Sequence, residues 1–248
     1  MTAAFSLDGK RALITGASGG IGRALAHHLH QHGATVALSG RNNDALTALA
    51  NELKQRTHVI VADLADANAP EALSQQATAE MGGIDILINN AGLTRDQLLL
   101  RLKEQDWDDV LNVDLSASFR LCRHVVPLMV KNRWGRIISI SSVVARMGNP
   151  GQTAYCAAKG GLEGFSRALA HEVAARNITV NCIAPGFIDT PMTSGLAEPL
   201  KEKMLGAIPC RRFGHPDDIA ATAVFLASAS AAYITGQTIH VNGGMIMP

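Results

Sequence analysis

A tyrosine and a lysine stand four residues apart in the segment TAYCAAKG, residues 153–160. On a helix this spacing places Tyr155 and Lys159 on one face, one turn apart. A free phenol has a pKa near about 10, and a neighbouring ammonium lowers that pKa by stabilising the phenolate. The pair is therefore suited to proton transfer, provided that the fold brings it to a site.

A serine stands where it could act with this pair. Ser142 follows the apolar run RIISIS, residues 136–141, and should lie at the carboxyl end of a strand, where the sites of parallel sheets form. Its hydroxyl could polarise a carbonyl group while Tyr155 gives or takes the proton. A tyrosine and a lysine at this spacing also occur by chance on many helices, so the interpretation depends on the surrounding elements.

The elements that must position these side chains alternate along the chain. Strand-like runs are nearly continuous in apolar residues, as expected for a parallel sheet that is covered on both faces. Alternation with helical segments predicts a single-domain, Rossmann-type, doubly wound α/β fold of about seven strands over residues 1–248. The strands are expected at 11–15, 35–39, 58–62, 84–89, 136–141, 178–184 and 237–241, and the helices at 21–32, 44–55, 70–81, 104–131, 154–175 and 216–228.

One connection is long for such a domain. Residues 187–215, which contain Pro191, Pro199 and Pro209, follow a predicted strand and precede a helix. Long loops at strand ends are often lids or binding loops, so this stretch is interpreted as the substrate loop.

The first strand leads into TGASGGIG, residues 15–22. Glycines allow a tight turn and let the backbone approach a ligand, while the following helix directs free N–H groups and its positive end at that ligand. A pyrophosphate fits this arrangement, although the glycine spacing is not G-x-G-x-x-G and a purely structural turn remains an alternative. The residues concerned are Gly16, Ser18, Gly19, Gly20, Ile21 and Gly22.

The second strand ends in LSGRNND, without the carboxylate that holds the ribose 2′-hydroxyl in NAD-binding folds of this type. Arg41 stands there instead, with a donor fork that suits a 2′-phosphate. NADP(H) is therefore favoured over NAD(H), against the alternative that Arg41 is an ordinary solvated arginine.

Taken together, these features resemble the short-chain dehydrogenase/reductase family over essentially the whole chain. The motifs are Thr15-Gly16-x3-Gly20-Ile21-Gly22, then Asn89-Asn90-Ala91-Gly92, Ser142, Tyr155-x3-Lys159, and Pro185-Gly186 with Thr190. The resemblance implies that Ser142, Tyr155 and Lys159 are catalytic and that the protein forms a homotetramer. It also implies cofactor contacts from Asp63, Leu64, Asn89, Ala91, Gly92, Tyr155, Lys159, Pro185, Gly186, Ile188 and Thr190.

Two positions depart from the family pattern. Family members usually have an asparagine that orders a proton-relay water near the lysine, and in LNVDLSASF the matching residue is Asp114. Asp114 is taken as a catalytic-site residue of unknown effect, while Asn112 is expected on another helix face. Relatives that use NADPH often carry a basic residue where Gly19 stands, so the 2′-phosphate preference falls largely on Arg41.

Longer stretches, such as 148–193 and 231–245, resemble one branch of the family, the 3-oxoacyl-[acyl-carrier-protein] reductases of type II fatty-acid synthesis. This implies reduction of a 3-oxoacyl thioester to the (R)-3-hydroxyacyl form with NADPH. It also implies docking of the acidic carrier protein on Arg133 and Arg176, which are expected near the mouth of the site. Alternatives are reduction of acetoacetyl-CoA, a hydroxysteroid or a small ketone, or a non-catalytic NADP(H)-binding subunit.

Composition excludes several other classes. With 22 basic and 21 acidic residues and a net charge of +1, the chain has no electrostatic footprint for nucleic acid or a membrane surface. It has no apolar signal segment and no run long enough to span a bilayer, and its four cysteines are widely spaced, so a cytoplasmic protein is expected. His28 and His32 have metal-ligand spacing, but no third ligand is evident and no metal site is predicted.

Overall fold

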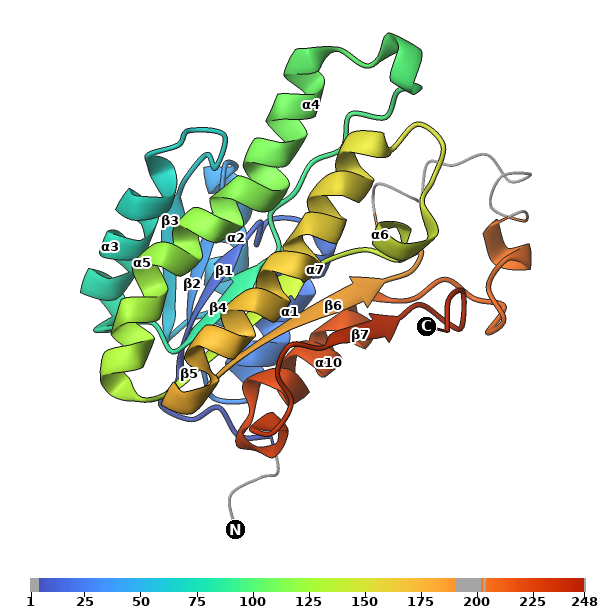
Figure 1. Cartoon of the computed structure of the whole chain (residues 1–248). Helices are drawn as coiled ribbons and strands as arrows, with labels where there is room; N and C mark the ends of the chain where they lie inside the picture. The colour runs from blue at the N-terminus through green and yellow to red at the C-terminus, as the bar shows by residue number, and fades with distance from the viewer. Residues whose placement is uncertain (1–4, 191–201, 203, 248) are drawn as a thin grey trace.

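The computed structural model describes residues 5–190, 202 and 204–247. Its centre is one sheet of seven strands, all parallel, in the order β3-β2-β1-β4-β5-β6-β7 (Figure 1). The Rossmann-type doubly wound sheet predicted from the sequence is confirmed, whereas the single-domain organisation over 1–248 stays a prediction. The strands are β1 Arg11–Thr15, β2 Thr35–Gly40, β3 Thr57–Val61, β4 Ile86–Asn89, β5 Gly135–Ile140, β6 Ile178–Pro185 and β7 Thr238–Val241.

Helices cover both faces of the sheet (Figure 1). The apolar cluster on one face includes residues of α1, α2 and α10, and the cluster on the other includes residues of α3, α5 and α7. Both clusters also contain alternate residues of the same strands, such as Ile14 and Leu13 of β1, which explains the continuous apolar runs. The α-helices are α1 Gly20–Gln31, α2 Asn43–Leu53, α3 Ala69–Met81, α4 Glu104–Leu111, α5 Ala117–Asn132, α6 Val144–Met147, α7 Thr153–Val173 and α10 Pro216–Ala227.

The helix predicted over 104–131 is interrupted. Between α4 and α5, residues Asn112–Ser116 form a π-helical segment, η2, and short 3-10 turns lie at Leu99–Arg101 (η1), Ala174–Arg176 (η3) and Ala229–Ala231 (η4). A π turn holds one residue more than an α turn and often occurs at functional sites. Its effect here is to change which side chains of the segment face α7, and periodicity in the sequence cannot reveal that change.

The described ends of the predicted substrate loop are held together. Ile188 pairs with Gly214 in a parallel bridge, and the Asp189 N–H donates to the Gly214 carbonyl at 2.8 Å. Residues 191–201 and 203 of the predicted loop lie outside the described residues. In the described part of the chain, no helix combines the length and the apolar character needed to cross a bilayer.

Candidate active site

The predicted site residues lie at one edge of the sheet. Because all strands are parallel, their carboxyl ends meet there, and the strand order reverses between β1 and β4, where ligands of doubly wound sheets bind. The glycine turn follows β1, Arg41 follows β2, and Asp63 and Leu64 follow β3. Asn89 ends β4, and Ser142 lies just beyond β5. Pro185 ends β6, followed by Gly186, Ile188 and Thr190.

The turn after β1 has room for backbone atoms at its glycine positions but no room for side chains there. Gly16 has a φ of +64°, a conformation that favours glycine. A Cβ on Gly22 would stand 2.1 Å from the Gly16 carbonyl oxygen, so the helix approaches the turn too closely for any other residue. Helix α1 begins after Gly19 with no side-chain cap, which leaves its first N–H groups available to a ligand. These features fit the pyrophosphate of a dinucleotide.

Two residues that brace this turn were missed as site residues. The Thr15 hydroxyl accepts hydrogen bonds from the Asn90 and Ala91 N–H groups at 3.0 and 3.1 Å, and Asn90 Nδ2 donates to the carbonyls of Thr15 and Gly16. Thr15 and Asn90 therefore tie the end of β1 to the loop after β4. Both appear in the sequence motifs, but only the structure shows that their role is to join two strand ends.

The predicted adenosine side of the site is open. Arg41 is exposed and forms no ion pair with the described residues, so its guanidinium is available at the tip of β2. Asp63 is exposed and Leu64 is buried beside it. Asn89 is buried, and its Oδ1 has no hydrogen-bond partner among the described residues. An unpartnered buried carbonyl oxygen of this kind is costly unless a ligand or water approaches it.

Tyr155, Lys159 and Asp114 meet between α7 and η2. Lys159 Nζ lies 5.4 Å from the centre of the Tyr155 ring, as the four-residue spacing predicts. The ammonium also lies 3.2 Å from Asp114 Oδ2 and donates to the Ile140 carbonyl oxygen at 3.0 Å. The other oxygen of Asp114 accepts the Leu93 N–H at 2.8 Å. Lys159 is 3% exposed and Asp114 is 0% exposed, so the two residues form a buried ion pair.

The pKa of Tyr155 lies above its ordinary value, although Lys159 acts on it in the predicted, lowering direction. Burial raises that pKa above its ordinary value, and Asp114 adds to the rise; Lys159 and the hydrogen bond with Ser142 act in the opposite direction without cancelling it. Burial alone would lower the pKa of Lys159, but Asp114 and Tyr155 raise it above the ordinary value. The lysine is therefore a cation whose charge is largely matched by its neighbour.

The segment that carries Ser142 is anchored by a residue that the sequence did not single out. Glu163, one turn beyond Lys159 on α7, is buried and accepts hydrogen bonds from Ser141 Oγ at 2.8 Å and Arg146 Nε at 3.0 Å. Ser141 precedes Ser142, and Arg146 lies on α6. Glu163 therefore holds the chain on both sides of Ser142. In the sequence, only its position eight residues after Tyr155, on the same helix face, indicates that it lies near the site.

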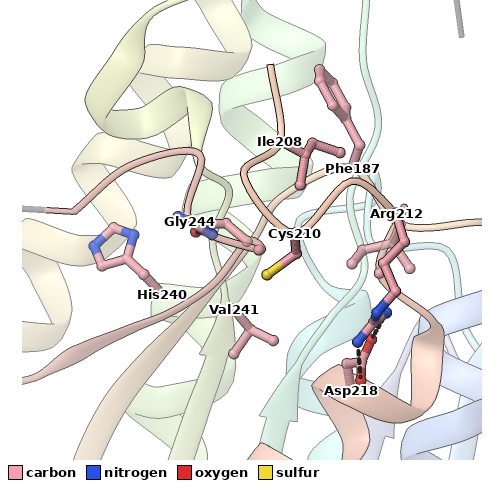
Figure 2. Close-up of a pocket in the computed structure, with 12 residues that line it drawn as sticks. Phe187, Ile208, Cys210, Arg212, Asp218, His240, Val241 and Gly244 are labelled. Carbon is pink, nitrogen blue, oxygen red and sulfur yellow. Dashed lines mark hydrogen bonds and ion pairs between the residues drawn. The ribbon is translucent and has the colours of Figure 1, made fainter. Parts of the chain in front are cut away.

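A pocket of about 330 Å³ lies beside the end of β7, among residues of the predicted substrate loop (Figure 2). Arg212 and Asp218 on its wall form an ion pair at 2.8 Å. Ser142, Tyr155 and Lys159 are not among its lining residues, so the pocket adjoins the nicotinamide end of the predicted site without containing the reacting groups. Its walls are Phe187, Ile188, Ile208, Cys210, Arg212, Gly214, Asp218, His240, Val241, Asn242, Gly243 and Gly244.

The two predicted docking arginines do not lie at the mouth of this site. Arg133 follows α5 and Arg176 ends η3, directly before β5 and β6 begin. They are neighbours, because Gly135 pairs with Ile178 and Asn177 Nδ2 donates to the Arg133 carbonyl. This pair occupies the amino edge of the sheet, opposite Ser142. Within one chain, the two arginines therefore do not lie near the mouth of the site as expected, because linear sequence does not show at which edge a loop emerges.

Comparisons with known proteins find relatives that match nearly the whole chain. A family model described as "Enoyl-(Acyl carrier protein) reductase" matches residues 16–246. Nodulation protein G of Rhizobium sp. (strain N33) is 53% identical over 98% of this chain and 99% of its own. The 3-oxoacyl-[acyl-carrier-protein] reductase of Vibrio harveyi is 47% identical over 98% of this chain and 99% of its own.

A solved structure gives the same result for the fold. A crystal structure described as a short-chain alcohol dehydrogenase from Sinorhizobium meliloti 1021 superimposes with a TM-score of 0.94 at 40% identity, covering 98% of both chains.

We predict that Gly92→Ala destabilises the fold through the buried ion pair. A Cβ at this position would stand 2.7 Å from Asp114 Oδ2 and 3.3 Å from Lys159 Nζ, so one of the two must move. The expected loss in the free energy of unfolding is about 1–3 kcal/mol, measured by chemical denaturation. The control is Gly164→Ala on α7, whose Cβ would meet only the Arg167 side chain at 3.8 Å. Equal unfolding free energies for the two variants would contradict the prediction.

Proposed function

Because the chain belongs to the short-chain dehydrogenase/reductase family of oxidoreductases, we propose that it reduces 3-oxoacyl-[acyl-carrier-protein] to the (R)-3-hydroxyacyl form with NADPH. Relatives named for this reaction support the substrate, since the chain matches them over nearly their full length. The name Nodulation protein G, carried by relatives of slightly higher identity, specifies no substrate. A cytoplasmic location is part of the same proposal.

The observation that carries the proposal is the meeting of Ser142, Tyr155 and Lys159 at the carboxyl edge of β5. In the reaction, the Ser142 hydroxyl donates a hydrogen bond to the keto oxygen, which polarises the carbonyl group. Tyr155 donates its phenolic proton to that oxygen as the alcohol forms. Lys159, next to the phenol, stabilises the phenolate that remains. The dinucleotide supplies the hydride when it is bound.

Tyr155→Phe tests the assignment of the acid. Removing the phenolic proton donor should lower the turnover of a 3-oxoacyl substrate by at least about 100-fold, while the affinity for NADPH changes little. NADPH oxidation and cofactor binding, measured on the same preparation, separate the two effects. Turnover that persists near the parent level would show that another group donates the proton.

The family uses nicotinamide dinucleotides, and we infer NADP(H) for this chain. The support is Arg41, an exposed guanidinium with no ion-pair partner among the described residues, at the strand end where a ribose 2′-phosphate would lie. The residues that we propose to hold the rest of the dinucleotide are the glycine turn with Asp63, Leu64, Asn89, Ala91 and Gly92, together with Pro185 at the end of β6 and Gly186, Ile188 and Thr190 beyond it.

Arg41→Ala should raise the Michaelis constant for NADPH about 10- to 100-fold, because a charge-assisted contact to the 2′-phosphate is lost. The Michaelis constant for NADH should change little, so each cofactor is the control for the other. Equal effects on the two cofactors would remove Arg41 from this role.

The proposed substrate implies that the protein binds an acyl carrier protein. Arg133 and Arg176 form an exposed basic pair, which suits an acidic partner. Since they lie at the amino edge of their own sheet, a carrier protein bound to them would reach the active site of another protomer more readily than that of the same chain. A homotetramer, as expected from the family, is compatible with such an arrangement.

The proposed substrate predicts a preference for acetoacetyl-[acyl-carrier-protein] over acetoacetyl-CoA in NADPH oxidation. Arg133→Ala with Arg176→Ala should lower kcat/KM about tenfold for the carrier-protein substrate and leave the CoA substrate unaffected. Arg123→Ala, at an exposed position of α5, serves as the control for loss of a positive charge. Equal use of the two substrates would favour a CoA-level reductase.

A further inference from the structure

The aspartate on η2 changes the charge of the site. An asparagine at position 114 would leave Lys159 as the one charged member of the pair, and its full positive charge would act on Tyr155. Here a carboxylate oxygen lies 3.2 Å from the ammonium, and both groups are almost fully buried. At such a distance, the negative charge of Asp114 offsets part of the effect that the positive charge of Lys159 has on a third group nearby.

The pair is also held in one geometry. Lys159 lies between two acceptors, Asp114 Oδ2 and the Ile140 carbonyl oxygen, and Asp114 is fixed from the other side by the Leu93 N–H. Gly92 lies against both side chains, and the π turn at Asn112–Ser116 places Asp114 toward α7. Asn112, two residues earlier, instead donates to the Ala65 carbonyl and accepts from Arg120. Position 114 is thus the one that reaches Lys159.

We propose that Asp114 is a positioning residue that fixes and neutralises Lys159, so that Tyr155 faces an internal ion pair instead of a free cation.

Few other charges act on the phenol. Among the described residues, the charged groups that act on the phenol are Lys159 from α7, Asp114 from η2 and Asp96 from the loop before η1, and Asp96 too disfavours the phenolate. The Ser142 hydroxyl favours it. Cys182 of β6 also faces Lys159, but burial raises the pKa of its thiol to about 11, which leaves it neutral near physiological pH. Burial has the largest effect on how readily Tyr155 loses its proton, and among the neighbouring charges the balance between Lys159 and Asp114 matters most.

The consequence, which rests on the proposed function, concerns the pH range in which each direction of the reaction is catalysed. Reduction needs the protonated phenol as acid, whereas oxidation of the alcohol needs the phenolate as base. A neutral ion pair keeps Tyr155 protonated to higher pH than a free lysine would. Asp114 thereby extends reduction of the keto group toward alkaline pH and moves the onset of alcohol oxidation to higher pH.

Tyrosine content makes a direct test possible. The chain has two tyrosines, and Tyr233 is fully exposed, so Tyr233→Phe leaves Tyr155 as the only phenol. Tyrosinate absorbance in the near ultraviolet is then followed against pH on the full chain without cofactor, with Tyr155→Phe in the same background as the blank. This readout requires no substrate, so it is independent of the proposed reaction.

In the Tyr233→Phe parent, the midpoint of the tyrosinate absorbance change, called the phenolate step below, should lie above the ordinary tyrosine pKa of about 10. With Asp114→Asn it should move at least about one pH unit lower, since the lysine is no longer neutralised. Asp108→Asn, the same change at an exposed position of α4, should leave the step in place. Thermal unfolding of each variant at neutral pH identifies any that fail to fold.

Two results would overturn the proposal. One is a tyrosinate transition of the Tyr233→Phe parent with its midpoint well below about pH 10, as a lysine without a neutralising partner would produce. This measurement requires no substitution in the ion pair. The other is a folded Asp114→Asn variant whose step coincides with that of the parent. If instead the step shifts as expected but no 3-oxoacyl substrate turns over, the proposed function fails while the role of Asp114 stands.

Discussion

The parallel direction of all seven strands is the constraint on which this structure depends. Parallel pairing requires a crossover after every strand, and the crossovers place helices on both faces. All carboxyl ends then meet at one edge. Side chains that are up to 175 residues apart in the chain, from the turn at Thr15 to Thr190, reach that edge without any direct signal between them. A catalytic and cofactor-binding site can form there because the scaffold brings loops together.

The buried polar groups at this edge are held in linked sets. Thr15 and Asn90 join β1 to the loop after β4, and Glu163 joins α7 to the segment around Ser142. A buried polar group without a partner costs free energy, so each of these bonds stabilises the fold as well as the geometry of the site. Stability and positioning thus depend on the same contacts.

The ion pair of Asp114 and Lys159 illustrates how one atom alters chemistry on a fixed scaffold. Aspartate and asparagine have nearly the same shape and accept the same hydrogen bond from Leu93, but only aspartate carries charge. A buried charge is tolerated here because its partner lies within 3.2 Å. The charge of Asp114 therefore bears both on the stability of the buried pair and, as proposed above, on the proton affinity of Tyr155.

The sequence by itself determined the seven strands, their parallel arrangement and the motifs that follow them, because apolar runs and glycine turns are local patterns that report burial and backbone freedom. Its motifs, through their resemblance to a known family, also pointed to Tyr155, Lys159 and Ser142 as site residues. Tertiary structure decided three matters that depend on distances between remote segments. Asp114, which the family resemblance already placed near Lys159, forms a direct ion pair with it. Glu163 anchors the Ser142 segment, and Arg133 with Arg176 lie at the edge opposite the site. None of these is visible in local pattern, since each is set by how one element packs against another.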